Sequence, residues 1–155
     1  MVSEIDKYIK LVLHFLSYRS RTEKEIATYL HRKVPLAQEE TIVREVLNYL
    51  QQFNLINDTK FCHEFISSRL NKHKGPKIIK LELRTKGIDQ LIIDQCLSTV
   101  PTSALYQSAK DFILKKSSLI KKTPNRFQSM KIVKILYSRG FDRQTINAVI
   151  DDLLS

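Results

Sequence analysis

The side chains of this chain that could do chemistry are four histidines, two cysteines and the pair of carboxylates near the C-terminus. The histidines are His14, His31, His63 and His73, the cysteines are Cys62 and Cys96, and the paired acids are Asp151 and Asp152. None of the histidines or cysteines stands at the spacing of a zinc site or of an H-E-x-x-H motif. No glycine-rich phosphate loop is present either, and the two cysteines fit buried, reduced thiols. We therefore expect no enzyme, no metal site and no cofactor.

Positive charge is the chemistry that the chain does offer. Lysine and arginine number 26 against 16 aspartates and glutamates, a net charge of +10, and the sequence pI is near 9.7. Up to Asn57 the charges nearly cancel, and beyond it bases outnumber acids about two to one. Such a surplus favours a polyanionic partner, with nucleic acid first and an anionic membrane or acidic protein surface next. The alternative is a lysine-rich surface that only meets water.

The basic residues gather in two clusters that are the candidate binding sites. The first cluster consists of Arg69, Lys72, Lys74, Lys77, Lys80, Arg84 and Lys86, interrupted by Glu82. The second cluster consists of Lys115, Lys116, Lys121, Lys122, Arg126, Lys131 and Lys134. Each cluster is dense enough to follow phosphates or an acidic protein surface.

Residues 75–98 form the element that must position the first cluster. Pro76 suits the first position of a helix, Gly87 can take the positive φ that ends it, and Asp89 can cap the next helix. Lys77, Lys80 and Arg84 are spaced so that they share one helix face. The sequence thus predicts a helix, a tight turn and a second helix, with a basic outer face.

Helical spacing of apolar residues continues along the whole chain and predicts nine helices without a strand. We expect them at about 4–18, 22–32, 39–53, 59–73, 76–86, 90–98, 103–119, 124–139 and 143–154. A capping box at Thr22 and Glu25 starts the second helix, and Asp58 and Asp142 should cap the fourth and the last. Gly75 should end the stretch before Pro76, and Asn54 can take a left-handed conformation at the end of the third helix.

The nine helices group as three repeats of three, because equivalent residues recur about 53 positions apart. Ile26, Ile79 and Ile132 are equally spaced, and so are Leu30, Leu83 and Leu136. We predict an all-α fold of three tandem three-helix repeats, 1–56, 57–100 and 101–155, that form an elongated, curved stack. A single helical bundle with coincidental spacing is the alternative.

The same register aligns the basic positions of the middle repeat with apolar ones in the last. Lys77, Lys80 and Arg84 correspond to Met130, Val133 and Tyr137. We expect the last repeat to pack this face against its own first helix or the middle repeat, while the middle repeat exposes it.

Several motifs together resemble the RecX family of recombination regulators. They are the opening Arg19-Ser20-Arg21-Thr22-Glu23-x-Glu25, the central Leu55-Ile56-Asn57-Asp58-x-x-Phe61 and Lys74-Gly75-x-x-x-Ile79-x-x-Glu82-Leu83-x-x-Lys86-Gly87-Ile88, and the terminal Arg139-Gly140-Phe141. Asn54 and Asn57 depart from the family's glycine and aspartate, Ile26 from its leucine, and Val34-Pro35 from the first-repeat glycine.

The resemblance implies a protein that binds the RecA recombinase. Such a protein would lie in the deep groove of the RecA–DNA filament, inhibit ATP hydrolysis, strand exchange and coprotease activity, and modulate DNA repair, recombination and the SOS response. It could cap or destabilise the filament, and weaker electrostatic binding to single- and double-stranded DNA would accompany this.

We expect a cytoplasmic protein, because the N-terminus lacks the pattern of a secretory signal and no apolar run could cross a bilayer. We also expect a monomer. The rival function is a helix-turn-helix-like regulator that binds duplex DNA directly. The outward side chains of 76–86 are nearly all lysine and arginine, which bind phosphates but rarely distinguish bases on their own.

Overall fold

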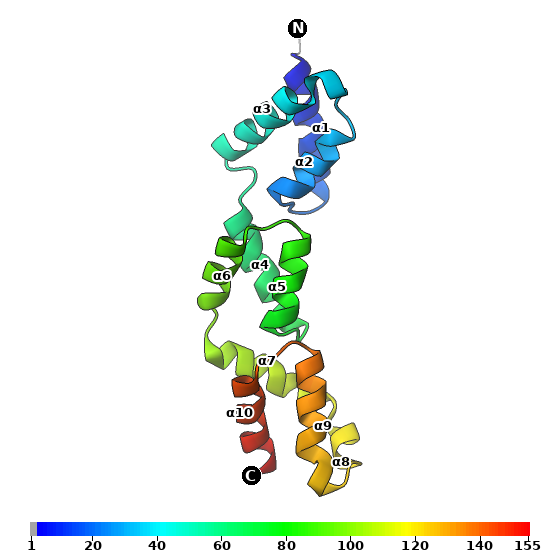
Figure 1. Cartoon of the computed structure of the whole chain (residues 1–155), viewed down its shortest axis with the longest axis vertical. Coiled ribbons are helices and arrows are strands. Elements are labelled where there is room, and N and C mark those ends of the chain that lie inside the picture. The colour runs from blue at the N-terminus through cyan, green and yellow to red at the C-terminus, as the bar shows by residue number, and fades with distance from the viewer. Residues whose placement is uncertain (1–2) are drawn as a thin grey trace.

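The computed structural model describes residues 3–155, and all the regular structure in this range is helical. In chain order the first repeat holds α1 (Glu4–Tyr18), α2 (Glu23–His31), the 3-10 helix η1 (Leu36–Gln38) and α3 (Glu39–Gln52), and the second holds α4 (Asp58–Asn71), α5 (Pro76–Thr85) and α6 (Gln90–Ser98). The third holds α7 (Thr102–Lys115), α8 (Ser117–Lys121), α9 (Asn125–Ser138) and α10 (Arg143–Leu154). Figure 1 shows an elongated, gently curved stack with the two termini near opposite ends. The predicted all-α class is confirmed.

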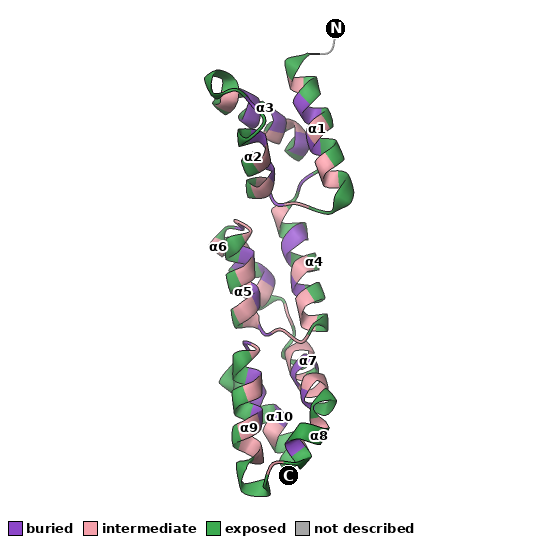
Figure 2. Cartoon of the chain, turned by 90° about the vertical axis from the view of Figure 1, so that its right-hand side faces the viewer, coloured by how far each residue is buried: buried purple, intermediate pink, exposed green. Residues whose placement is uncertain are grey.

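Each repeat has its own hydrophobic core, and each core contains the residues that recur every 53 positions. Ile26, Ile79 and Ile132 are each 0% exposed, and so are Leu30, Leu83 and Leu136. The three sets of buried side chains form separate clusters, one for each repeat. Figure 2 shows the buried residues as three groups along the stack. The chain is therefore an array of small cores and not one helical bundle.

The helix ends follow the predicted signals at most positions. Thr22 and Glu25 form the capping box of α2, and the Asp89 and Asp142 carboxylates accept hydrogen bonds from the first turns of α6 and α10. Gly87 has a φ of 82°, the left-handed conformation expected where α5 ends. These caps fix where each helix begins and ends before any packing is considered.

Two predicted caps were wrong. Asn57, not Asp58, caps α4 by accepting a hydrogen bond from the Lys60 N–H. The Asp58 carboxylate instead accepts from the Glu23 N–H at the start of α2. Gly75 does not end α4 but serves as the N-cap of α5 with a φ of −83°, whereas His73 takes the left-handed φ of 57°.

The single helix predicted for residues 103–119 was also wrong, because the helix is interrupted at Lys116. The helix α7 ends at Lys115, and the five-residue α8 begins at Ser117, so ten α-helices and one 3-10 helix occupy residues 3–155. Ser117 and Ser118 are weak helix formers. The turn brings Ile120 into the third core, where it is 6% exposed.

The helices α2, α5 and α9, which occupy equivalent positions in the three repeats, stack end to end. The C-terminal end of α9 meets the N-terminal end of α5, and the C-terminal end of α5 meets the N-terminal end of α2. Figures 1 and 2 both show α2, α5 and α9 as one line along the molecule, which we call the helical column. At both joints, the positive N-terminal end of one helix dipole therefore lies against the negative C-terminal end of the other.

Candidate functional site

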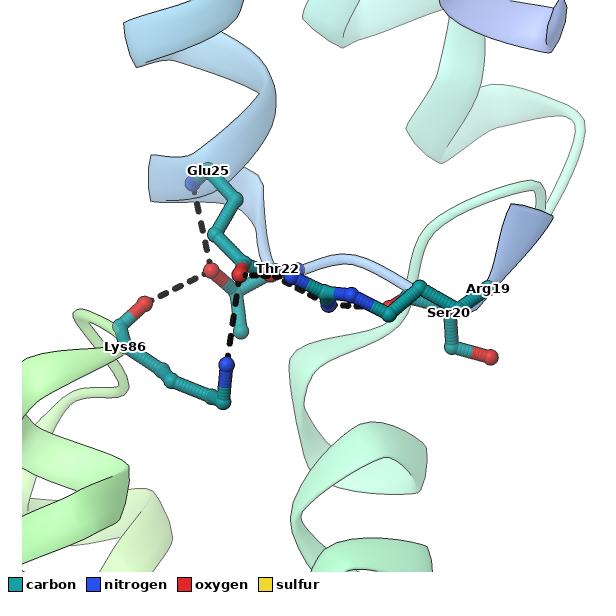
Figure 3. A network of polar contacts seen from close by, with 5 residues as sticks. All are labelled: Arg19, Ser20, Thr22, Glu25 and Lys86. Carbon is teal, nitrogen blue, oxygen red and sulfur yellow. Dashed lines mark hydrogen bonds and ion pairs between the residues drawn. The ribbon is translucent and has the colours of Figure 1, made fainter. Parts of the chain in front are cut away.

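The joint between the first and second repeats is a small polar network (Figure 3). The Thr22 hydroxyl donates to the Lys86 carbonyl at 2.6 Å, and the Lys86 ammonium lies 3.4 Å from the Glu25 carboxylate. Arg19 pairs with the same carboxylate at 2.7 Å. Burial alone would raise the pKa of Glu25, but the Arg19 and Thr22 hydrogen bonds and the Lys86 charge lower it to about 2. The joint therefore holds an ionised carboxylate between two cations.

The joint between the second and third repeats forms at the equivalent positions, 53 residues after those of the first joint. Its contacts are hydrogen bonds between backbone groups. The Gly75 N–H donates to the Arg139 carbonyl at 2.6 Å, and the Lys77 N–H donates to the Gly140 carbonyl at 3.1 Å. A Cβ on Gly75 would overlap the Gly140 carbonyl group, so only glycine allows this approach. The Arg139 guanidinium also donates to the carbonyls of Lys72 and His73 at the end of α4. Hydrogen bonds therefore cross the column at both joints.

Four of the seven residues in the first basic cluster are paired with carboxylates of the same chain. The pairs are Arg69 and Lys74 with Glu82 at 2.5 and 2.6 Å, Lys80 with Asp94 at 3.1 Å, and Lys86 with Glu25. Burial would raise the pKa of Glu82, but the hydrogen bonds from Lys74 and Arg69 lower it overall. These cations hold α4, α5, α6 and the first joint in place, so much of their charge is neutralised.

The other three residues of the first cluster keep their charge free of a carboxylate within residues 3–155. Lys72 lies exposed at the end of α4, and Arg84 donates only to the neutral Gln90 amide at 2.7 Å. Lys77 is exposed at the start of α5, with its ammonium 5.1 Å from the centre of the Tyr137 ring. Lys77 and Arg84 are exposed as predicted, whereas Lys80 is half-buried beside Asp94 of α6.

The second basic cluster has no carboxylate partner anywhere in the described chain. Lys115 and Lys116 end α7, Lys121 and Lys122 end α8, and Arg126, Lys131 and Lys134 lie on α9. Only Lys115 has a hydrogen-bond partner for its side chain, the His73 ring at 2.8 Å. The third repeat holds ten basic and four acidic residues, the second eight and five, and the first eight and seven. Positive charge therefore grows along the stack toward the third repeat.

The apolar face predicted to be packed in the last repeat is exposed, so that prediction was wrong. Met130 is 66% exposed, Tyr137 63% and Val133 42%. The reason is geometric: α9 continues the line of α5, so no helix of either repeat lies over its outer side. The sequence signal was present, since α9 carries apolar residues on more sides than its own core needs.

The structure brings Cys96 within 3.6 Å of the His63 ring and next to Cys62. Residues 3–155 contain no group of three or more histidine, cysteine or acidic side chains that could hold a metal ion. Burial and the neighbouring Cys96 thiol raise the pKa of Cys62 to about 12, so this thiol is a poor nucleophile. Asp152 is bound by Lys110 at 2.7 Å and by the Tyr106 hydroxyl. None of the described helices is both long and apolar enough to cross a bilayer.

Comparison with known proteins places this geometry in one family. Residues 10–50 match the first three-helix domain of RecX and residues 57–97 match the second, so the two matches of 41 residues each cover more than half of the 155 residues. The regulatory protein RecX of Oceanobacillus iheyensis is 33% identical over 96% of this chain, and that of Halalkalibacterium halodurans is 30% identical over 97%. The chain spans about half the length of these two relatives, 54% and 56%.

The solved structures agree with the sequence matches. A crystal structure of RecX from Lactobacillus salivarius superposes with a TM-score of 0.87 at 29% identity, over 96% of each chain. A second crystal structure of a regulatory protein RecX gives 0.80 at 29% identity, over 95% of this chain and 73% of that one. With the two domain matches, the conserved architecture shows that the chain belongs to the RecX family of regulatory proteins.

Proposed function

We propose that the chain is a cytoplasmic negative regulator of a RecA-type recombinase. In this proposal it binds the groove of the RecA–DNA filament and inhibits ATP hydrolysis, strand exchange and coprotease activity. It thereby modulates DNA repair, recombination and the SOS response. It does so as a binding protein without a cofactor, and not as an enzyme.

The observation that carries the proposal is an elongated stack with its unpaired positive charge toward one end. A helical filament groove is long and curved. A folded stack joined at two places could contact several neighbouring protomers there, and it would lose little conformational entropy on binding. The second cluster and Lys72, Lys77 and Arg84 of the first have no carboxylate partner within the described residues. They are therefore available for acidic protein surface or phosphate.

Direct DNA binding follows from the same charges and is the weaker property in this proposal. Contacts to phosphates alone are lost steeply as salt rises, since they depend on counterion release. The rival, a sequence-specific duplex regulator, is not favoured. The helix α6 that follows the turn presents Leu91, Asp94 and Gln95 to solvent, and the Asp94 carboxylate is already paired with Lys80 at 3.1 Å, so this helix offers few free groups to distinguish bases.

The test replaces Lys77, Lys80 and Arg84 together with glutamate. Helicity should persist, because these side chains lie outside the core. Thermal stability should fall only slightly, through the lost Lys80–Asp94 pair. Inhibition of RecA-promoted strand exchange should weaken about tenfold or more, measured as the protein concentration for half inhibition.

A control with the same change in charge replaces Lys10, Arg32 and Lys33 with glutamate. These three residues are exposed on the first repeat. This control should inhibit nearly as well as the parent protein. Equal inhibition by the first variant and the parent would show that Lys77, Lys80 and Arg84 do not contact the filament. A strong preference of the parent for one duplex sequence at fixed salt would instead favour the rival function.

A further inference from the structure

The outer side of α9 carries a row of large apolar side chains that the fold leaves uncovered. This row, which we call the α9 stripe, consists of Phe127, Met130, Val133 and Tyr137, exposed by 43%, 66%, 42% and 63%. Their spacing of three or four residues puts them on one face of the helix. The core of the repeat is formed on the opposite face by Ile132 and Leu136, so the stripe lies outside this core.

The stripe is specific to the third repeat. In the register of the array, Met130, Val133 and Tyr137 occupy the positions that Lys77, Lys80 and Arg84 occupy on α5. The same backbone position thus tolerates charge in one repeat and carries apolar bulk in the other. Exposed apolar side chains grouped in this way mark interaction sites more often than chance.

At its C-terminal end the stripe opens into a hollow between α5, α9 and α10. The hollow has a volume of about 640 Å³, and Val133 and Tyr137 belong to both the stripe and its wall. The remaining apolar wall comes from Pro76, Phe141 and Ile146. A hollow of this size accepts one or two large apolar side chains, so the stripe and the hollow form one surface about 15 Å long with an anchor pocket at one end.

Positive charge surrounds this surface. Lys77 and Arg143 line the hollow, and Arg126, Lys131 and Lys134 lie along α9. None of these five has a carboxylate partner among residues 3–155. The one acid in the wall, Asp142, already accepts the Thr145 N–H at 2.7 Å as the cap of α10. Complementary charge therefore requires an acidic occupant.

We propose that the α9 stripe is the docking face for an acidic amphipathic helix of a partner protein. Such a helix would place apolar anchors at i, i+4 and i+7 along the stripe and in the hollow, with its acidic side chains toward the basic rim. Under the function proposed above, on which this assignment of the partner rests, the helix belongs to the RecA-type recombinase. Nucleic acid fits the surface less well, because the aliphatic Met130 and Val133 separate the two aromatic rings that could stack on bases.

The test introduces on α9 the residues that α5 carries at the equivalent positions. The substitutions are Met130→Lys, Val133→Lys and Tyr137→Arg. These substitutions raise the charge by three, so an electrostatic contact would strengthen and an apolar contact would weaken. A control with the same change in charge replaces Leu81, Leu91 and Leu119 with lysine, at 55%, 69% and 44% exposure outside the stripe.

The first probe is a labelled 16-residue peptide of glutamate and alanine with leucines at helical i, i+4, i+7 and i+11. We expect the parent and the control to bind it, and the stripe variant to bind at least tenfold more weakly by fluorescence anisotropy. A version with lysine for every glutamate should not bind the parent. Equal binding by the stripe variant and the parent, or no binding of the acidic peptide to the parent, overturns the proposal.

The second probe is the RecA filament on single-stranded DNA, with bare single-stranded and duplex DNA measured alongside. The stripe variant should lose at least tenfold in filament affinity and keep or gain affinity for both bare DNAs. A parallel loss on bare single-stranded DNA would make the stripe a base-stacking surface. A parent that sediments as a dimer and a variant that sediments as a monomer would make it a self-association face.

The two probes separate this inference from the proposed function. If the parent neither binds nor inhibits the filament, the proposed function fails, while the peptide still decides the chemistry of the stripe. If the parent inhibits and the stripe variant inhibits equally, the docking assignment fails and the proposed function stands.

Discussion

At the scale of single residues, Glu25 links three parts of the structure. Its carboxylate closes the capping box of α2 through the Thr22 N–H, holds Arg19 at the end of α1, and contacts Lys86 of the next repeat. One side chain thus couples a helix start to the joint between repeats. A residue that looks like an ordinary N3 glutamate in the sequence is also an inter-repeat contact.

Replacing Glu25 with glutamine should destabilise the protein in a manner that depends on pH. The folded-state pKa of about 2 lies below the ordinary value of 4.5, so the carboxylate stabilises the fold fully above pH 4.5 and progressively less down to pH 2. Because the side chain is 20% exposed, solvent screening reduces the expected cost at pH 7 to roughly 1–2 kcal/mol. Urea unfolding at pH 7 and pH 3 measures this difference.

The matched control is Glu45→Gln, at an exposed position of α3. It should change the free energy of unfolding by less than about 0.5 kcal/mol at either pH. A cost for Glu25→Gln that is the same at pH 7 and pH 3 would contradict the assigned role, because the variant would then be losing something other than the charge.

At the scale of elements, the joints convert three short helices into one column. Unpaired N–H groups at a helix start and unpaired carbonyls at a helix end usually need caps or water. In the second joint the Gly75 and Lys77 N–H groups meet the Arg139 and Gly140 carbonyls directly. Each end thereby satisfies the other, and the angle between the two repeats is fixed by backbone contacts.

Gly75→Ala should break this second joint. The added Cβ has no room against the Gly140 backbone, so the repeats must separate, at a cost of roughly 1–3 kcal/mol. The Lys77 amide, whose hydrogen bond crosses the joint, should then lose its protection from hydrogen exchange. Gly87→Ala is the control: it strains a positive φ and crowds Lys24 at the first joint, where the Lys24 Cβ would lie 2.5 Å from the added atom, and it should leave the Lys77 amide protected.

The sequence was sufficient for the long helices and their cores but not for the break between α7 and α8 or for the joints. Ile26, Ile79 and Ile132 could be found because burial of one helix face imposes a periodicity that residue types record. The hydrogen bond from Thr22 to Lys86 could not, because the two residues are 64 positions apart and no local signal reports their contact. The exposure of Met130 was missed for the same reason, since whether an outer face is covered depends on the angle between repeats.

The positions of the basic clusters could be predicted from the sequence, but which of their cations pair with carboxylates could not. The sequence located both basic clusters, but it did not show that Arg69 and Lys74 share Glu82. Those contacts depend on how α4 packs on α5, which spacing along one helix does not determine. The domain boundaries 1–56, 57–100 and 101–155 stay a prediction, as does the role of each individual cation.

At the scale of the whole molecule, three separate cores joined end to end make a chain whose stability is shared between neighbours. In such arrays each repeat contributes its own stability and an interface with the next, and the repeats at the ends have one neighbour each. The middle repeat here contacts both others, through Lys86 on one side and Gly75 on the other. Equivalent core residues should therefore not have equivalent effects.

Truncating Ile26, Ile79 or Ile132 to alanine tests this directly, because all three are 0% exposed at the same position of the repeat. Each removes similar volume and should cost roughly 2–5 kcal/mol within its own core. Ile26→Ala should speed amide hydrogen exchange in α1–α3 and leave α7–α10 nearly unchanged. Ile79→Ala should speed exchange in all three repeats, since the outer repeats lose the neighbour that stabilises them. Uniform acceleration by all three variants would mean that the stack unfolds as one cooperative unit, and the joints would then be as strong as the cores they connect.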